Sequence, residues 1–110
     1  EERSNSAAKK AMLYIQENYS KDISLDDVSG LVNISPYYFS KIFKEETGEN
    51  FIEYLTKIRI EKAKEFLVKP DISIKEAGIR SGYTDPNYFS RIFKKQTDMT
   101  PSEYKTRYGE

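Results

Sequence analysis

YYFSKIFKEET (residues 37–47) and NYFSRIFKKQT (residues 87–97) are two versions of one segment, fifty positions apart in a chain of 110 residues. Seven of the eleven aligned positions are identical, and Lys41 and Arg91 keep the same charge. Self-similarity at a fixed offset indicates a structural unit that occurs twice. The fold of this chain therefore has to place the same segment in two equivalent settings.

The repeated segment predicts a helix with two different faces. In the first copy, Phe39, Ile42 and Phe43 have the spacing of a buried apolar stripe. The opposite face carries no acid in either copy. Its residues are Tyr37, Ser40, Lys41 and Lys44 in the first copy and Asn87, Ser90, Arg91 and Lys94 in the second. One such face would suit a solvated surface equally well, but two copies with the same arrangement favour a contact surface.

Helix start signals recur along the rest of the chain. Five segments begin with a side chain that can cap a helix, followed by a proline or by an acid three residues later. These capping residues are Ser24, Ser35, Ser73, Asp85 and Thr100. Alternating strand patterns bounded by Asn-Gly or Asp-Gly turns do not occur. The sequence therefore predicts an all-α chain of seven helices, at residues 7–19, 25–32, 36–47, 51–68, 74–81, 86–97 and 101–107.

These helices form two helix-turn-helix pairs with a long helix between them. Each pair, 25–32 with 36–47 and 74–81 with 86–97, is joined by a turn of three to four residues. The predicted division is an N-terminal linker remnant at 1–6, a first subdomain at 7–49, a linker helix at 50–69 and a second subdomain at 70–110.

The long helix 51–68 is apolar around more than half of its circumference, whereas packing on one core requires a stripe of only about 100°. We expect this helix to pack against both subdomains and to fix the distance between them. Arg59 lies within the apolar arc. Its side chain has three possible roles: its head reaches water, it contacts a phosphate, or it forms a buried ion pair with a carboxylate, which is the role we favour.

Composition argues against several classes of protein. The chain has no cysteine and no histidine, so disulfides are excluded and the usual metal ligand and general base are missing. Eighteen basic residues balance eighteen acidic ones, so the position of the charges decides what the chain binds. No segment has the length and apolarity of a bilayer span. We predict a cytoplasmic protein, a piece of a longer chain, without enzymatic activity or cofactor.

Double-stranded DNA gives the outward faces a purpose. Lys and Arg reach guanine, Asn pairs with adenine, and Ser bonds either edge, from a helix that fits the major groove. The predicted base-reading residues are Tyr37, Ser40, Lys41, Asn87, Ser90 and Arg91. The predicted phosphate contacts are Ser35, Tyr38, Lys44, Tyr88, Lys94 and Lys95. A helical protein-interaction module without DNA binding is the alternative, and it would favour apolar or mixed-charge outer faces.

Four motifs resemble the DNA-binding domain of AraC/XylS-type bacterial transcription regulators. They are SPYYFSKIFKEETG (35–48), RIEKAKEFL (59–67), GYTDPNYFSRIFK (82–94) and TPSEYK (100–105). The resemblance implies two helix-turn-helix subdomains that read DNA together, most often as an activator, with RNA polymerase as a partner. The domain as a whole resembles response regulators of this family, which implies an N-terminal receiver domain. Relatives with an effector-binding domain and stand-alone relatives are the alternatives.

Three residues depart from the family pattern. Ser29 and Gly78 stand where alanine is usual, and Asp98 replaces a glycine after the second recognition helix. Gly78 is expected to weaken its helix by up to about 1 kcal/mol. Because Asp adopts the left-handed conformation less readily than glycine, we expect a different helix end at Asp98.

Overall fold

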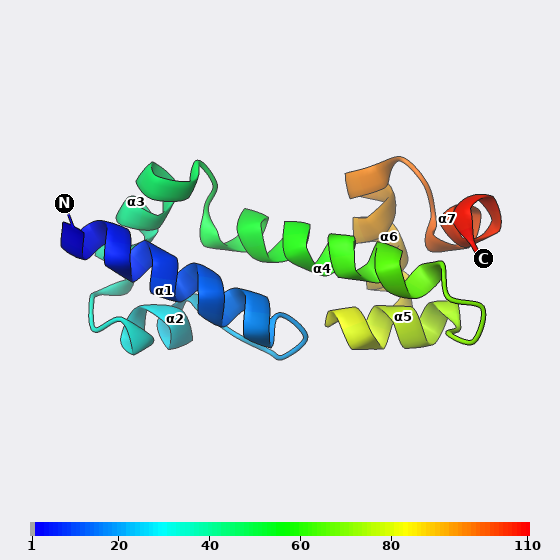
Figure 1. Cartoon of the computed structure of the whole chain (residues 1–110), viewed down its shortest axis with the longest axis horizontal. Helices are drawn as coiled ribbons and strands as arrows, with labels where there is room; N and C mark the ends of the chain where they lie inside the picture. Colours follow the sequence, from blue (N-terminus) through cyan, green and yellow to red (C-terminus); the bar gives the residue numbers. More distant parts are fainter. Residues whose placement is uncertain (1) are drawn as a thin grey trace. The chain divides into compact units, whose positions relative to one another are not determined.

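The computed structural model describes residues 2–110, with side chains from residue 6 onward. Over this range the chain forms seven α-helices and no strand, which confirms the predicted all-α class (Figure 1). The chain divides into two compact units, unit 1 (Glu1–Lys57) and unit 2 (Ile58–Glu110). Each unit has its own core and its own helix-turn-helix pair.

Unit 1 consists of α1 (Glu2–Asn18), α2 (Leu25–Leu31), α3 (Pro36–Thr47) and the first part of α4 (Phe51–Leu67). The helices α1, α2 and α3 pack against one another around a core of fully buried side chains. These include Ala11, Ile15, Val28, Phe39 and Phe43. The apolar stripe predicted for the first repeat therefore lies in this core.

The first helix is longer than predicted, because it begins at Glu2 rather than at residue 7. Residues 2–6 contain neither proline nor glycine, so nothing in them ends a helix. Residues 2–6, which were expected to belong to a linker remnant at 1–6, are therefore part of α1. Glu1 lies outside the described residues.

Unit 2 consists of the rest of α4, α5 (Ile74–Ser81), α6 (Pro86–Thr97) and α7 (Pro101–Tyr108). Its core is a cluster of buried residues: Ile60, Ala63, Leu67, Ile72, Ala77, Tyr83, Phe89 and Phe93. The ammonium of Lys105 donates to the carbonyls of Leu67, Lys69 and Ile72 at 2.8–3.0 Å. A cation is favourable at a helix C-terminus, so Lys105 fastens the end of α4 to α7.

The repeat extends beyond the recognition helices into the elements that follow them. Tyr54 at the start of α4 meets Phe43 edge-to-face at 5.4 Å, and Tyr104 of α7 meets Phe93 in the same way at 5.5 Å. The first part of α4 therefore does for unit 1 what α7 does for unit 2. The second part of α4 supplies Ile60, Ala63 and Leu67 to the core of unit 2, which explains its wide apolar arc.

The predicted capping residues sit at helix N-termini. Ser24 and Asp27 exchange two hydrogen bonds at the start of α2, and Thr100 and Glu103 do so at the start of α7. Of the two hydrogen bonds in the capping box expected at Ser73, only one forms. Ser73 Oγ accepts from Glu76 N at 3.0 Å, but the Glu76 carboxylate turns to Arg80, whose Nε donates to it at 2.9 Å one turn along the same helix.

The expectation of a different helix end at Asp98 is wrong. Asp98 has φ = 65° and Gly48 has φ = 82°, so both C-caps are left-handed. Each N–H donates to the carbonyl four residues back, at 2.8 Å. The threonine before each cap, Thr47 or Thr97, also bonds across the bend with its hydroxyl. These shared bonds hold the non-glycine residue in the left-handed region.

Gly78 permits a close approach of helices in unit 2. A Cβ placed on Gly78 would lie 2.8 Å from Cδ2 of Phe89, a buried ring of α6. Ser29 takes this position in unit 1 and is itself buried. Gly78 therefore has a role in packing, which its low helix propensity did not indicate.

Candidate nucleic-acid interface

The first turns of α3 and α6 are fixed by their N-caps. Ser35 Oγ accepts from the backbone N–H of Tyr38 at 3.2 Å. In unit 2, Asp85 Oδ1 accepts from Asn87 N at 2.9 Å and from Tyr88 N at 3.4 Å. Each helix has a proline in its first turn, which presets φ and has no N–H to satisfy. These bonds fix the first turn of each helix, and with it the positions of the first outward side chains, Tyr37 and Asn87.

Buried aromatic rings fix the rotation of each helix about its axis. The ring centroids of Phe39 and Phe43 are 5.3 Å apart, and those of Phe89 and Phe93 are 5.8 Å apart. All four side chains are 0–1% exposed. Because these rings lock one side of each helix into a core, the opposite side must face outward.

All twelve predicted site residues lie on α3, on α6 or at the cap of α3, in two sets of six, one set per unit. Ten are exposed: Ser35, Tyr37, Tyr38, Lys41, Lys44, Asn87, Tyr88, Arg91, Lys94 and Lys95. Ser40 and Ser90 are half-buried. Tyr37 is the most exposed of the large hydrophobic side chains that the structure describes, with 82% of its surface exposed. A hydroxyl that caps a helix, as Ser35 does, can still donate its proton to a phosphate.

Arg91 rests against an aromatic side chain of its own helix. Its guanidinium carbon lies 5.7 Å from the ring centroid of Tyr88, and Tyr88 in turn lies 5.8 Å from the ring of Tyr83. Stacking on an aromatic ring restricts the directions in which a guanidinium points. Tyr88, predicted as a phosphate contact, therefore also limits the orientation of Arg91, which is predicted to read bases.

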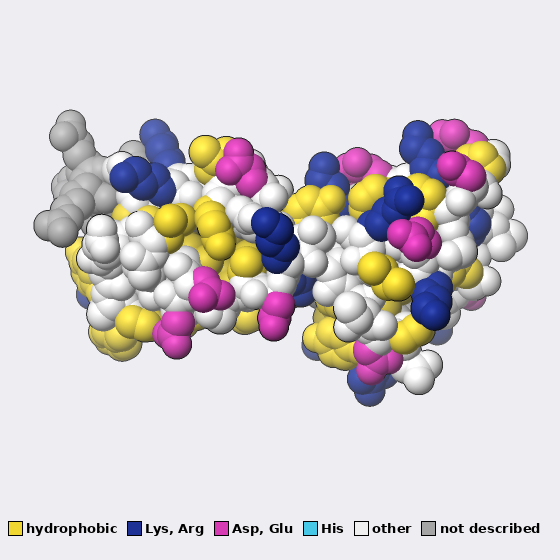
Figure 2. Space-filling view, turned by 90° about the horizontal axis from the view of Figure 1, so that it is seen from below, with side chains coloured by type: hydrophobic (Ala, Val, Ile, Leu, Met, Phe, Trp, Pro, Cys, Tyr) yellow, Lys and Arg dark blue, Asp and Glu magenta, His cyan; other side chains and the backbone are white. Residues whose placement is uncertain are grey.

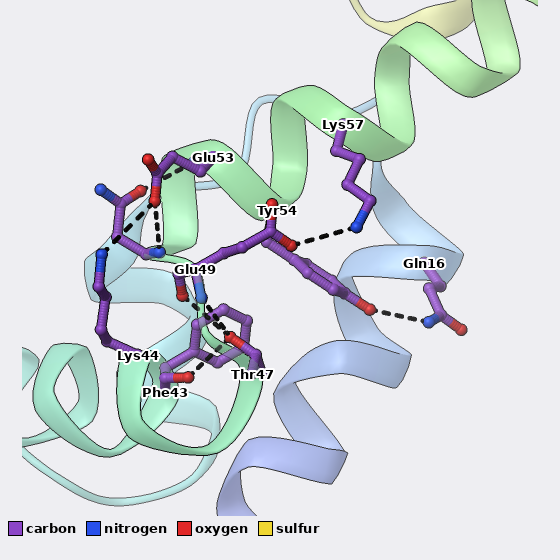
Figure 3. Close-up of polar contacts among 9 residues, drawn as sticks. Gln16, Phe43, Lys44, Thr47, Glu49, Glu53, Tyr54 and Lys57 are labelled. Carbon is purple, nitrogen blue, oxygen red and sulfur yellow. Dashed lines mark hydrogen bonds and ion pairs between the residues drawn. The ribbon is translucent and has the colours of Figure 1, made fainter.

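Lys44 and Lys94 meet a similar neighbour, which the sequence analysis missed. Lys44 Nζ lies 4.0 Å from Glu53 Oε1, and the same oxygen accepts from Asn50 N at 2.9 Å (Figure 3). In unit 2, backbone and side-chain hydrogen bonds from Thr100 lower the pKa of the Glu103 carboxyl, and the charge of Lys94 lowers it further. Extending the fifty-residue repeat as far as Glu53 and Glu103 would have revealed this pairing.

Arg59, on α4, lies in unit 2 and is not part of the outward face of α3 or of α6. Its guanidinium carbon lies 5.4 Å from the ring centroid of Tyr83, and its side chain is half-buried. The stacking on Tyr83 was not among the three roles considered from the sequence.

Other kinds of site leave no trace in the part of the chain that the structure describes. Its His, Cys, Asp and Glu residues form no group of three or more that could hold a metal ion. None of the described helices combines the length and apolarity needed to cross a bilayer. On the face shown in Figure 2, basic side chains are interspersed with acidic and apolar ones. The predicted reading positions of α3 and α6 differ from this face in that none of them is an acid.

The chain is similar in sequence to known transcription regulators. A family model described as "Helix-turn-helix domain" matches residues 28–107. Regulatory protein PocR of Salmonella typhimurium is 36% identical over 96% of this chain and 35% of its own length. The lactose operon transcription activator of Staphylococcus xylosus is 35% identical over 94% of this chain and 37% of its own length. The chain thus spans about a third of each of these relatives.

Among solved structures, the C-terminal domain of AraT, a response regulator from Geobacillus stearothermophilus, has the same fold. The TM-score is 0.90, at 39% sequence identity, over 94% of this chain and 87% of that domain. The likeness covers both helix-turn-helix units and the helix between them, since only 6% of the chain lies outside it.

Proposed function

This chain belongs to the AraC-type helix-turn-helix family of transcription regulators, and we propose that it binds double-stranded DNA in a sequence-specific manner. In this proposal α3 and α6 are recognition helices that enter successive segments of the major groove. Residues near the N-terminal end of each helix read base edges, as in other helix-turn-helix proteins. The basic residues one turn further along hold phosphates.

One observation carries the proposal. The same outward arrangement occurs on α3 and on α6: an exposed polar residue, a half-buried serine, and exposed basic residues one and four positions after the serine. No acid occurs at these positions in either helix, although the chain as a whole is neutral. A face of this kind suits an anionic partner with accessible hydrogen-bonding edges, which double-stranded DNA provides in its major groove.

The assignment of roles follows the helix positions. Tyr37, Ser40 and Lys41 read bases for α3, and Asn87, Ser90 and Arg91 read bases for α6. Ser35, Tyr38 and Lys44 contact phosphates beside α3, and Tyr88, Lys94 and Lys95 contact phosphates beside α6.

The salt dependence of duplex binding tests this function. Electrophoretic shift of random-sequence duplex DNA should show binding that weakens steeply between about 50 and 200 mM salt, because each neutralised phosphate releases counterions. Selection of bound sequences from a random pool should then yield a preferred site. If no duplex is shifted at low salt and the outward faces instead capture a partner protein, the chain is a protein-interaction module and the proposed DNA binding is wrong.

We further propose that the chain is the DNA-binding part of a longer cytoplasmic regulator, with an N-terminal receiver domain or effector-binding domain, and that it activates transcription in contact with RNA polymerase. The AraT response regulator and the Staphylococcus xylosus activator support this by analogy. A reporter driven by the selected site should gain expression when the full-length regulator is produced. A loss of expression would make it a repressor.

A further inference from the structure

The two units share one fold but carry opposite net charges. Unit 1 (Glu1–Lys57) contains seven basic and ten acidic residues, for a net charge of −3. Unit 2 (Ile58–Glu110) contains eleven basic and eight acidic residues, for a net charge of +3. The neutral total of the chain therefore conceals two units of opposite net charge.

The difference concentrates at the ends of the two recognition helices. Over residues 36–47, two lysines are cancelled by Glu45 and Glu46, whereas residues 86–97 carry three basic residues and no acid. The helix α3 is thus neutral and α6 has a charge of +3. At matched positions, the exposed Glu45 corresponds to the exposed Lys95, one turn after Lys41 and Arg91.

The surroundings of the basic residues strengthen this contrast. In unit 1, Lys44 lies 4.0 Å from Glu53, and Lys57 lies 3.3 Å from Glu49 (Figure 3). The residue of unit 2 that corresponds to Glu49 is Met99, which has no charge. Arg91 and Lys95 of α6 form no ion pair with any residue that the structure describes, whereas the charge of Lys94 acts on the Glu103 carboxylate, as that of Lys44 acts on Glu53. The charge of Lys95 is therefore uncompensated, whereas its counterpart Glu45 places a negative charge at the matched position of α3.

We propose that the two recognition helices divide the work of DNA binding, and that the pair Glu45 and Lys95 sets this division. This inference rests on the proposed DNA binding. The helix α6 supplies the sequence-independent attraction to phosphates, because the electrostatic part of affinity depends on how many phosphates are neutralised. The helix α3 adds little of this attraction and binds where its base contacts match. Unit 2 then holds DNA of any sequence through its phosphate contacts, in addition to its base contacts, whereas most of the affinity that unit 1 adds depends on its base contacts.

Charge exchange at the matched positions tests this in the intact chain. Glu45→Lys should steepen the salt dependence of log affinity by about one unit, or about 3.5-fold more affinity lost between 50 and 200 mM salt, because it adds one phosphate contact. It should also reduce the ratio of affinities for the selected and scrambled duplexes. Lys95→Glu should make the salt dependence shallower by about one unit on both duplexes.

A control with the same change in net charge distinguishes position from total charge. Glu17→Lys reverses an exposed acid on α1, in unit 1 but outside α3, and should leave the salt dependence near that of the unmodified chain. Glu45→Gln removes the acid without adding a cation and should raise affinity for scrambled DNA by less than Glu45→Lys does. Helix content and melting temperature of each variant confirm that it is folded.

The outcomes distinguish a failure of the proposed DNA binding from a failure of the proposed division of work. If the unmodified chain binds no duplex at low salt, the proposed function itself is wrong. If it binds with a steep salt dependence, but Glu45→Lys and Glu17→Lys change that dependence equally, the division of work between α3 and α6 is wrong. The same holds if Glu45→Lys and Lys95→Glu both leave the salt dependence unchanged.

Discussion

The helices α3 and α6 match on their inner side and differ on their outer side. Inside, each places two phenylalanines in a core, with the second one edge-to-face against a tyrosine of the following helix. Outside, matched positions of the repeat differ: Tyr37 of α3 corresponds to Asn87 of α6, and Glu45 corresponds to Lys95. The inner side has to satisfy the packing of its unit, which leaves little freedom. The outer side is free of this packing constraint, so its differences bear on the proposed recognition of DNA by each helix.

The largest expected effect tests the shared inner side. Phe43→Ala and Phe93→Ala should each lower the free energy of unfolding by about 3–5 kcal/mol, because each leaves a cavity in the core of one unit. Urea and thermal unfolding measure the loss. Ile52→Ala is a matched control, since Ile52 is 63% exposed and its loss should cost little. A small effect of either Phe substitution would mean that the helix faces are assigned in reverse.

The next effect concerns the outer side. Arg91→Ala should cost about 1–3 kcal/mol of binding on the selected site and relax the preference at one or two base pairs. Lys41→Ala should relax the preference at a different element of the site, because it sits at the same position of α3. Titration of selected and scrambled duplexes at fixed salt measures both. An equal loss on the two duplexes would show that Arg91 contacts only phosphate.

A pair of glycine substitutions compares the packing of the two helix pairs. Gly78→Ala should lower the free energy of unfolding by about 1 kcal/mol, since overpacking against Phe89 costs about 1–3 kcal/mol and better helix propensity returns about 1. Gly30→Ala, in α2, meets nothing within 4 Å and should raise it by about 0.5–1 kcal/mol. Stabilisation by both substitutions would show that the close approach at Gly78 is dispensable.

The smallest effect is a pH dependence in unit 2. Hydrogen bonds from Thr100 keep the pKa of Glu103 below its usual value of 4.5. A depressed carboxyl pKa contributes stability above pH 4.5 that is lost as the pH falls through the folded-state pKa. Glu103→Gln keeps an acceptor for the capping box but has no charge to lose. Unfolding of the two chains should therefore differ slightly at pH 7 and converge near pH 2; a constant difference would contradict this origin.

Local signals were sufficient to predict most of the fold. Capping residues such as Ser35 and Asp85 and the stripes of Phe and Ile act within one helix, so the sequence displays them directly. The early start of α1 at Glu2 lacked such a signal. Glu76 had two local partners, its own cap and Arg80, and only the structure decides between them. Asp98 was misjudged because the bonds of Thr97 that support its left-handed conformation join residues across a bend.

The candidate site was predictable in its orientation but not in its contacts. Helical periodicity places Lys41 and Arg91 outside as soon as the phenylalanines are placed inside. The stacking of Arg91 on Tyr88 and the approach of Lys44 to Glu53 depend on side-chain rotamers, which no spacing specifies. The closeness of Gly78 to Phe89 is likewise a distance between helices that the sequence does not display.

We propose that α3 and α6 read one DNA site together, at a spacing set by α4. That helix is unbroken from Phe51 to Leu67 and supplies buried side chains to both units. Successive major-groove segments on one side of the duplex repeat every 10–10.5 base pairs or so. Inserting about 5 base pairs between the two elements of the selected site turns one of them to the far side, and the advantage of linked binding is lost. Titration at fixed salt should then give the affinity of a single-element duplex, whereas an unchanged affinity would show that α4 acts as a flexible tether.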